Sequence, residues 1–137
     1  IVAEEGTKIQ LTETSRGLGG SKYWSLMQFR GANTFATEIA LTGRFFSVEE
    51  GHAAGIIDRV APKGQHLEVA MDLALQIAAN PPLSVRATVR TRRLKMEQIG
   101  REAQAQLNAQ KLFLTEDFHE AASAFAEKRK PNKFKGR

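Results

Sequence analysis

The segment from Leu41 to Val60, LTGRFFSVEEGHAAGIIDRV, constrains the fold more than any other stretch of this chain. Gly43 follows an apolar run with helical spacing, and glycine readily takes the left-handed conformation found at helix C-termini. Ser47 and Glu50 have the spacing of a capping box, in which each side chain accepts a hydrogen bond from the other residue's backbone N–H. The segment therefore predicts a helix end, a turn and a short second helix.

Short apolar segments before and after this region indicate strands. Gly55 ends the second helix, and residues 56–60, IIDRV, follow as a β-branched run that we expect to form a strand or an extended segment against the core. Residues 62–64, PKG, predict a turn after it. Residues 1–3 are apolar and residues 8–11 alternate in polarity, so each predicts a further short strand.

The second half of the sequence has helical periodicity throughout. Residues 66–79 predict an amphipathic helix that ends at the Asn-Pro-Pro sequence following it. Ser84 is placed to cap the next helix, and residues 98–114 predict another helix that pairs with it. Thr115 predicts the N-cap of a final helix. The expected inner stripe of that helix consists of Phe118, Ala121, Ala122 and Phe125.

Composition excludes several classes of protein. The chain has no cysteine, which rules out disulfides and thiolate metal sites, and its three histidines are scattered without a second ligand at helical spacing. We therefore expect no metal. No apolar run approaches the roughly 18 residues that span a bilayer, so we expect a soluble protein of the reducing cytoplasm.

The net charge of +5 is a property of the C-terminal tail. Without the tail the chain is close to neutral. No aromatic side chains are interleaved with the arginines of residues 86–93, so nucleic-acid binding is not indicated. The six basic residues of the tail are Lys128, Arg129, Lys130, Lys133, Lys135 and Arg137.

Glu13 is the strongest candidate for a catalytic group. It lies just beyond the strand predicted at residues 8–11 and before a glycine-rich loop, a position where a strand fixes the backbone and a loop leaves room for substrate. The loop allows close approach of its backbone to a ligand. Ser21 is placed to cap the helix after it, and Trp24 lies in an aromatic-rich patch that either packs in the core or lines a pocket.

Three segments resemble the enoyl-CoA hydratase/isomerase (crotonase) family in the order in which the family has them. Residues 41–62 resemble its hallmark segment, and residues 1–20, with Glu13, resemble the region after its first oxyanion-hole segment. Residues 115–137 resemble its C-terminal helix and tail. The resemblance implies the α/β crotonase (ClpP/crotonase-like) fold, of which this chain holds a few short strands and mostly helices.

Members of the family are much longer than this chain, so the resemblance implies that it is the C-terminal half of one. Residues 1–62 then correspond to a remnant of the spiral core. Residues 63–137 correspond to a helical oligomerisation region with a basic tail. The expected assembly is a homo-oligomer, either a trimer or a hexamer built as a dimer of trimers.

The resemblance also implies an activity in fatty acid metabolism, the addition of water to a 2-enoyl-CoA through an enolate held in an oxyanion hole. Glu13 matches a catalytic glutamate, Gly19, Gly20 and Trp24 match the substrate pocket, and Lys128 matches a lysine that holds coenzyme A. Coenzyme A enters as the substrate's thioester, and no cofactor is implied. The oxyanion N–H groups and a second glutamate are expected outside this chain, which alone should turn over little substrate.

Two departures from the family pattern leave alternatives open. The loop between Leu18 and Gly19 is shorter than usual, and Thr12 stands where a proline is common. An enoyl-CoA isomerase, or another crotonase reaction such as thioester hydrolysis or decarboxylation, is therefore an alternative. A non-catalytic helical assembly module is a second alternative. The sequence does not identify the acyl chain.

Overall fold

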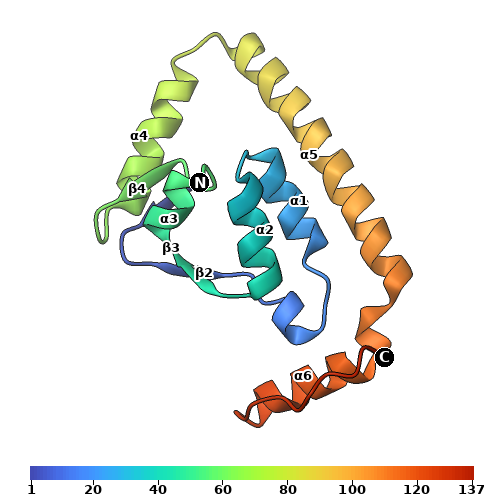
Figure 1. Cartoon of the computed structure of the whole chain (residues 1–137). Helices are drawn as coiled ribbons and strands as arrows, with labels where there is room; N and C mark the ends of the chain where they lie inside the picture. The colour runs from blue at the N-terminus through green and yellow to red at the C-terminus, as the bar shows by residue number, and fades with distance from the viewer.

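The four strands are three residues long and pair in two separate ladders. The computed structural model describes residues 1–137. β1 (Val2–Glu4) runs parallel to β4 (Arg59–Ala61). β2 (Lys8–Gln10) runs antiparallel to β3 (Phe45–Ser47). The two ladders therefore pair strands of the first ten residues with strands between residues 45 and 61 (Figure 1).

The helix end and the capping box predicted from the sequence are both confirmed. α2 (Asn33–Thr42) ends at Gly43, whose φ of 62° lies in the left-handed region. α3 (Val48–Ala53) begins with a reciprocal pair of hydrogen bonds. The Ser47 hydroxyl accepts the Glu50 N–H at 3.1 Å, and the Glu50 carboxylate accepts the Ser47 N–H at 2.8 Å. These bonds satisfy backbone donors that the start of a helix leaves unpaired.

The strand expected at residues 56–60 is displaced, and β4 occupies residues 59–61 instead. Ile56 and Ile57 are buried, but their backbone N–H groups donate to the carbonyl oxygen of Gly51 at 2.8 and 3.1 Å. They therefore close the end of α3 and are not available to pair with a strand. Hydrophobic pattern predicted their burial correctly and their backbone conformation incorrectly.

The core lies between the two ladders and the helices α2 and α3. Phe35 and Phe46 meet edge to face, with ring centroids 5.5 Å apart. Eight buried residues make up the core: Met27, Ala32, Ala36, Ile39, Phe46, Val48, Ile56 and Ile57. Burial of this apolar surface provides the main driving force for the first half of the chain.

Two long helices leave this core and return to it. α4 (His66–Ala78) points away from the strands, and α5 (Pro82–Gln110) folds back past α1 (Ser21–Phe29), as Figure 1 shows. The prediction of two helices in this region is wrong, because α5 is continuous over 29 residues. The predicted cap at Ser84 is also wrong. Pro82 occupies the first helical turn, where its missing N–H costs nothing.

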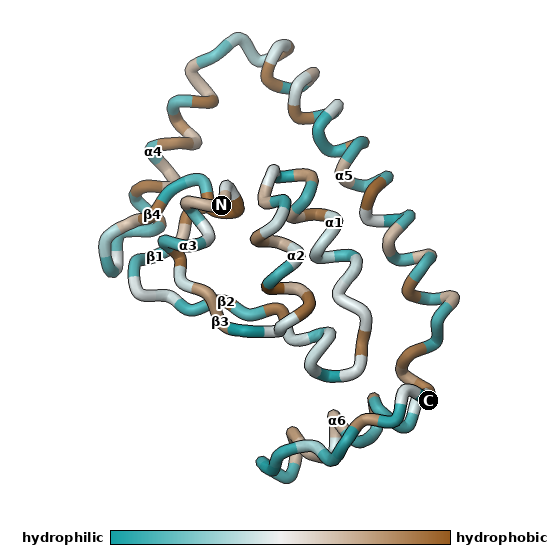
Figure 2. The backbone as a smooth tube through the Cα atoms, in the orientation of Figure 1, coloured by the Kyte–Doolittle hydropathy of each residue, from teal (hydrophilic) through white to brown (hydrophobic).

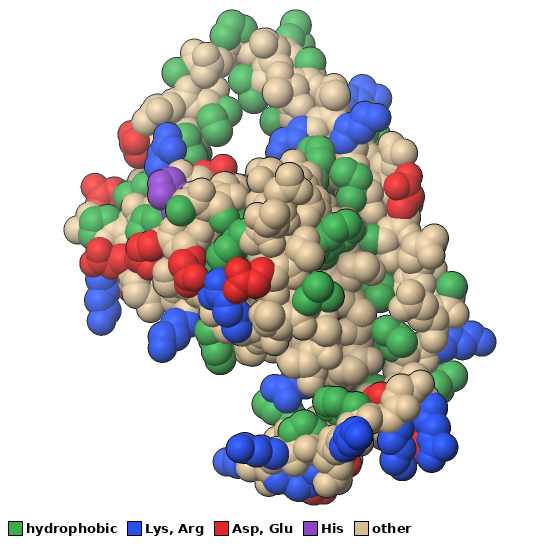
Figure 3. Space-filling view, viewed as in Figure 1, with side chains coloured by type: hydrophobic (Ala, Val, Ile, Leu, Met, Phe, Trp, Pro, Cys, Tyr) green, Lys and Arg blue, Asp and Glu red, His purple; other side chains and the backbone are tan.

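Most of the surface of α4 and α5 is not covered by the rest of the chain. Only 16 of the 137 residues are buried, none of them on α4 and one on α5. Apolar positions recur along both helices in Figure 2, and Figure 3 shows an opening between their corner and the rest of the molecule. None of the helices has both the length and the apolar character needed to cross a membrane. The division at residue 62 stays a prediction.

The C-terminal helix packs through small residues. α6 (Glu116–Ala126) buries Ala121 and Ala124, at 3% and 2% exposure. The prediction that Ala122 and Phe125 face inward is wrong, because both are exposed, Phe125 to 63%. The Arg16 guanidinium lies 3.7 Å from the centroid of the Phe125 ring and covers one face of it. Close packing of α6 therefore selects alanine, and the larger side chain remains at the rim.

The connection from α5 to α6 is a tight turn. Lys111 ends α5 in the left-handed conformation with a φ of 46°, and the 3₁₀ helix η2 (Leu112–Leu114) follows. Thr115 then caps α6, as predicted, by accepting the Phe118 N–H at 3.1 Å. This turn places η2 against the glycine-rich loop described below.

Candidate functional site

The glycine loop, residues 17–20, connects a short 3₁₀ helix, η1 (Thr14–Arg16), to α1. The sequence predicted no regular structure before it, so η1 is an addition. The Leu18 N–H donates to the carbonyl oxygen of Glu13 at 2.8 Å and closes the loop on itself. Gly17 has a φ of 73°, a conformation that glycine takes without strain.

Glu13 and Ser21 lie at the two ends of this region and share one property. Oε2 of Glu13 and Oγ of Ser21 are the only buried side-chain polar atoms in the chain without a hydrogen-bond partner. The predicted capping role of Ser21 is wrong. Gly20 occupies the N-cap, and no side-chain oxygen caps α1. A buried polar atom without a partner costs about 1–3 kcal/mol, so both atoms are candidates for contact with a ligand.

The loop is in direct contact with helices from the far end of the sequence. A methyl group at Gly19 would overlap with Cδ2 of Leu107 on α5, and it would lie 3.3 Å from Cδ1 of Leu112 on η2. A side chain at this position would therefore require the Leu107 side chain, and to a smaller extent that of Leu112, to move aside. This contact closes a cavity on each side of the loop.

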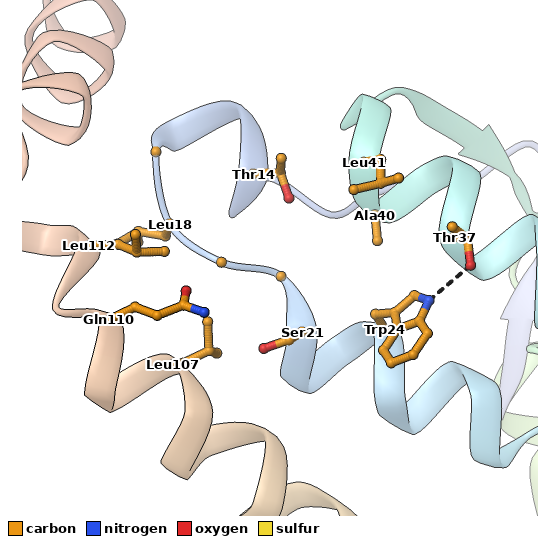
Figure 4. A pocket seen from close by; sticks show the side chains of 13 residues that line it. Thr14, Leu18, Ser21, Trp24, Thr37, Ala40, Leu41, Leu107, Gln110 and Leu112 are labelled. Carbon is orange, nitrogen blue, oxygen red and sulfur yellow. Dashed lines mark hydrogen bonds between the residues drawn. The ribbon is translucent and has the colours of Figure 1, made fainter. Parts of the chain in front are cut away.

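The larger cavity has a volume of about 520 Å³ and lies between the glycine loop, α1, α2 and the α5–η2 turn (Figure 4). Its walls are mainly apolar. The indole Nε1–H of Trp24 donates to the hydroxyl of Thr37 at 2.9 Å, which fixes the indole ring in the wall between α1 and α2. The apolar lining residues are Leu18, Trp24, Ala40, Leu41, Leu107 and Leu112.

The smaller cavity, of about 280 Å³, contains Glu13. Lys22 and Tyr23 of α1 line it from one side, and Gln104 and Asn108 of α5 line it from the other. It shares four lining residues with the larger cavity, so the two are neighbours separated by one wall. The shared residues are Leu18, Gly19, Leu107 and Leu112.

Four of the five residues proposed from the sequence meet at this place. Glu13 and Gly19 line the smaller cavity, and Gly19, Gly20 and Trp24 line the larger one. Lys128 lines neither of these cavities. It follows α6 in the left-handed conformation, with a φ of 55°. The structure therefore groups the catalytic candidate with the pocket residues and leaves the proposed coenzyme A contact apart.

Sequence reasoning missed the wall that α5 contributes. Gln104, Leu107 and Asn108 face the loop from positions about 90 residues further along the chain. Their spacing of three and four residues indicates one helix face. That spacing carries no information about which surface the face meets.

The basic tail folds back onto α6. Most of its hydrogen bonds and ion pairs are made with acidic residues that do not line either cavity. Asp117 accepts the backbone N–H groups of Lys135 and Gly136 at 2.7 and 2.8 Å. Glu120 accepts a hydrogen bond from Arg129 at 2.6 Å, and this bond contributes most to lowering its pKa to about 2. The tail is therefore an ordered strap, and no ion pair in the structure involves Lys128.

Charged groups at the two cavities include no candidate metal centre. No three histidine, aspartate or glutamate side chains come together anywhere in the chain. The carboxyl groups with lowered pKa lie elsewhere. One is Glu50, whose pKa falls chiefly because it accepts the Ser47 backbone N–H. The buried groups without a partner at the cavities are one carboxylate oxygen, of Glu13, and one hydroxyl, of Ser21, beside an apolar wall.

Comparison with known proteins shows which family the chain resembles in sequence. The family model described as enoyl-CoA hydratase/isomerase matches residues 1–137. An enoyl-CoA hydratase of Mycobacterium tuberculosis is 36% identical over 141 residues, which cover 93% of this chain and 53% of that protein. A 2,3-dehydroadipyl-CoA hydratase of Escherichia coli is 33% identical over 142 residues, with coverage of 100% and 54%. The chain thus spans about half the length of these curated relatives.

The fold is shared with solved structures as well. A carnitinyl-CoA dehydratase from Mycobacterium avium superimposes with a TM-score of 0.81 at 30% identity, covering 99% of this chain and 55% of that one. The crotonase fold expected from the sequence is confirmed by this match. The few strands and many helices of the chain agree with the predicted composition of secondary structure.

Proposed function

This chain belongs to the enoyl-CoA hydratase/isomerase family, and from that we propose that it supplies the general acid/base Glu13 to an enzyme that adds water to a 2-enoyl-CoA. The observation that carries the proposal is the buried Oε2 of Glu13, which has no hydrogen-bond partner inside the protein. A carboxylate in that state is ready to bind a water molecule or a substrate proton.

The position of Glu13 suits this role. The residue follows β2 and precedes η1, and the hydrogen bond from the Leu18 N–H to its backbone carbonyl holds the main chain in place. Its side chain enters a cavity of about 280 Å³, next to the apolar wall that the glycine loop forms with α5. A fixed backbone and an unpaired carboxylate oxygen give Glu13 a defined position and a free acceptor for a proton.

The proposed reaction proceeds in two proton movements. The Glu13 carboxylate takes a proton from water while the water oxygen bonds to C3, and the electrons of the C2–C3 double bond move onto the thioester carbonyl. The resulting enolate then takes this proton at C2 from the Glu13 carboxylic acid, which restores the carboxylate and yields the 3-hydroxyacyl-CoA. Hydrogen-bond donors that hold the enolate oxygen usually contribute the largest share of such catalysis.

We assign the remaining site residues to substrate binding. Gly19 and Gly20 let the acyl thioester approach the loop backbone, and Trp24 forms part of the apolar wall. Lys128 belongs to the end of the site that holds the phosphates of coenzyme A, which is consistent with its lack of an ion-pair partner. The coenzyme A thioester is the substrate itself, and the proposal includes no cofactor and no metal.

Replacement of Glu13 by glutamine tests this function. In the protein that carries this chain, Glu13→Gln should lower the kcat for hydration by about 10²–10⁴ and leave KM little changed, because the amide cannot accept the proton. The matched control is Glu68→Gln, which removes an exposed carboxylate from α4. Unchanged hydration kinetics in Glu13→Gln would reject the assignment.

A comparison of substrates separates hydration from double-bond migration. An isomerase moves the double bond of a 3-enoyl-CoA to the 2-position and consumes no water. Assays of wild-type protein with 2-enoyl-CoA and 3-enoyl-CoA substrates, followed by product analysis, decide between the two reactions. Hydrated product from the 2-enoyl substrate supports the proposal, whereas isomerised 3-enoyl substrate with no hydration supports the alternative.

Exposed apolar helix faces support a homo-oligomer. We propose that it is a trimer or a dimer of trimers, located in the cytoplasm and acting in fatty acid metabolism. Leu67 and Leu75 on α4 are 67% and 65% exposed, which is unusual for large apolar side chains of an isolated chain. In this proposal residues 1–62 belong to the spiral core and residues 63–137 to the oligomerisation region. Light scattering of wild-type protein and of Leu75→Lys tests the assembly, since the charged variant should be smaller.

A further inference from the structure

We propose that the larger cavity holds the far end of the acyl chain and that the Ser21 hydroxyl binds a hydroxyl group carried by that chain. The inference rests on the proposed function for the identity of the ligand as an acyl thioester. Its own basis is separate, because it concerns Ser21 and a cavity that Glu13 does not line. It assigns a substrate class that the reaction type leaves open.

The cavity is suited to an acyl chain in size and character. Its volume of about 520 Å³ falls within the usual range for small-molecule sites, about 300–1,000 Å³. Leu18, Leu107 and Leu112 separate it from the cavity of Glu13, so a chain whose reacting carbons lie at Glu13 reaches it by passing this wall. A plain hydrocarbon chain would pack against the apolar residues, but it would leave one buried polar group of the wall without a hydrogen bond.

That group is the Ser21 hydroxyl. Its oxygen is buried and has no partner. In Figure 4 it points from the first turn of α1 toward Leu107 and Gln110 on the facing helix. Of the other polar groups in the wall, Trp24 donates to Thr37 at 2.9 Å and Thr37 donates to a backbone carbonyl oxygen at 3.3 Å, while Thr14 and Gln110 are exposed to solvent. Ser21 is thus the one buried hydrogen-bonding side-chain group of this cavity that remains available.

The chemistry around Ser21 favours a neutral oxygen over a carboxylate. A serine hydroxyl can both donate and accept, which matches the two roles of an alcohol. α1 begins at Ser21 with no side-chain cap, so unpaired backbone N–H groups at its start favour an acceptor oxygen nearby. Glu13 lines the neighbouring cavity, and its negative charge disfavours a second carboxylate on the other side of the shared wall.

Trp24 provides a direct readout, because it is the only tryptophan in the chain and lines this cavity. Three thioesters of N-acetylcysteamine serve as probes: hexanoyl, hexanoyl with a terminal hydroxyl, and hexanoyl with a terminal carboxylate. Titration of the 137-residue chain, monitored by Trp24 fluorescence, should show about tenfold tighter binding of the hydroxylated probe than of the plain one. The acyl chains are saturated, so no reaction competes with binding.

Two serine variants complete the test. Ser21→Ala should remove the preference for the hydroxylated probe and leave affinity for the plain probe unchanged or improved. Ser25→Ala, one turn further along α1 and outside the cavity lining, should keep the preference. Because the readout is binding, a failure of Glu13 in the hydration assay leaves this result unaffected.

The outcomes that overturn the proposal are distinct. Equal binding of the plain and hydroxylated probes by wild-type protein rejects a hydroxyl site, and tightest binding of the carboxylated probe rejects the choice of a neutral oxygen. A preference that persists in Ser21→Ala rejects Ser21 as the group responsible. No fluorescence response to any probe rejects the cavity as an acyl site, while the hydration assay still decides the role of Glu13.

Discussion

Gly17 lies directly against the backbone of Phe118, where the glycine loop meets the first turn of α6. A Cβ atom at Gly17 would lie 2.8 Å from Cα and 3.0 Å from the backbone nitrogen of Phe118. The same residue has a φ of 73°. Two separate constraints, one conformational and one of packing, therefore require glycine at this position. Through this contact the loop that follows Glu13 is coupled to the C-terminal helix.

Gly17→Ala should destabilise the chain more than the backbone conformation alone explains. An alanine at positive φ costs about 1–2 kcal/mol, and the clash with Phe118 adds to it because a backbone atom cannot move aside as a side chain does. Gly6→Ala is the matched control, since Gly6 has a φ of 75° and nothing within 4 Å of the added methyl. Denaturant unfolding of both variants measures the difference. Equal losses would show that the contact with α6 carries no free energy.

Ser21→Ala should not destabilise the chain, although the residue is in a packed region. The Ser21 hydroxyl oxygen is buried without a partner, so its removal relieves a desolvation cost of about 1 kcal/mol. The expected free energy of unfolding is equal to that of wild type or higher. Denaturant titration of the two proteins measures it. A clear loss of stability would mean that the hydroxyl has a partner in solution, which would also remove the reason to assign it to a ligand.

Ser47→Ala should cost about 1 kcal/mol, the usual value for an N-cap. The change removes the oxygen that accepts the Glu50 N–H, and this cap holds α3 between β3 and the buried residues that follow. Ser47→Asp should recover most of the loss, because a carboxylate can accept the same hydrogen bond. Thermal unfolding monitored by circular dichroism provides the comparison. A destabilised aspartate variant would argue against capping as the cause.

The tail strap on α6 should open in acid. Hydrogen bonding from Arg129, and then from the backbone of Asn132, lowers the pKa of Glu120 from 4.5 to about 2. Because the folded pKa lies below the unfolded one, the strap's stabilisation is present above about pH 4.5 and falls away as the pH drops toward 2. The amide resonance of Asn132 reports the opening.

A control separates Glu120 from general acid effects. Glu120→Gln should release the Asn132 amide at neutral pH already, whereas Glu102→Gln, an exposed change on α5, should leave the strap closed and its acid midpoint unaltered. High salt should weaken the strap, since its ion pairs are exposed to solvent. An Asn132 signal that is independent of pH in wild-type protein would contradict this account.

The sequence alone determined those helix boundaries that depend on hydrogen bonds between residues close together in the chain. Gly43, the Ser47–Glu50 pair and Thr115 each mark a helix boundary through hydrogen bonds within a few residues, and all were predicted correctly. Glu13 and the glycine loop were identified by their order along the chain. The expected break before residue 98 was wrong, because α5 runs without interruption from Pro82 to Gln110.

Only the tertiary structure decided which helix faces contact which loops. The contact of Gly19 with Leu107, the two cavities on either side of it and the unpaired hydroxyl of Ser21 all depend on α5 returning to the loop across about 90 residues of chain. A helical pattern identifies an apolar face but does not identify the surface that the face covers. Sequence therefore determined the helix boundaries that local hydrogen bonds fix and indicated the catalytic candidate, and long-range packing created the pocket, because burial is a property of neighbours in space.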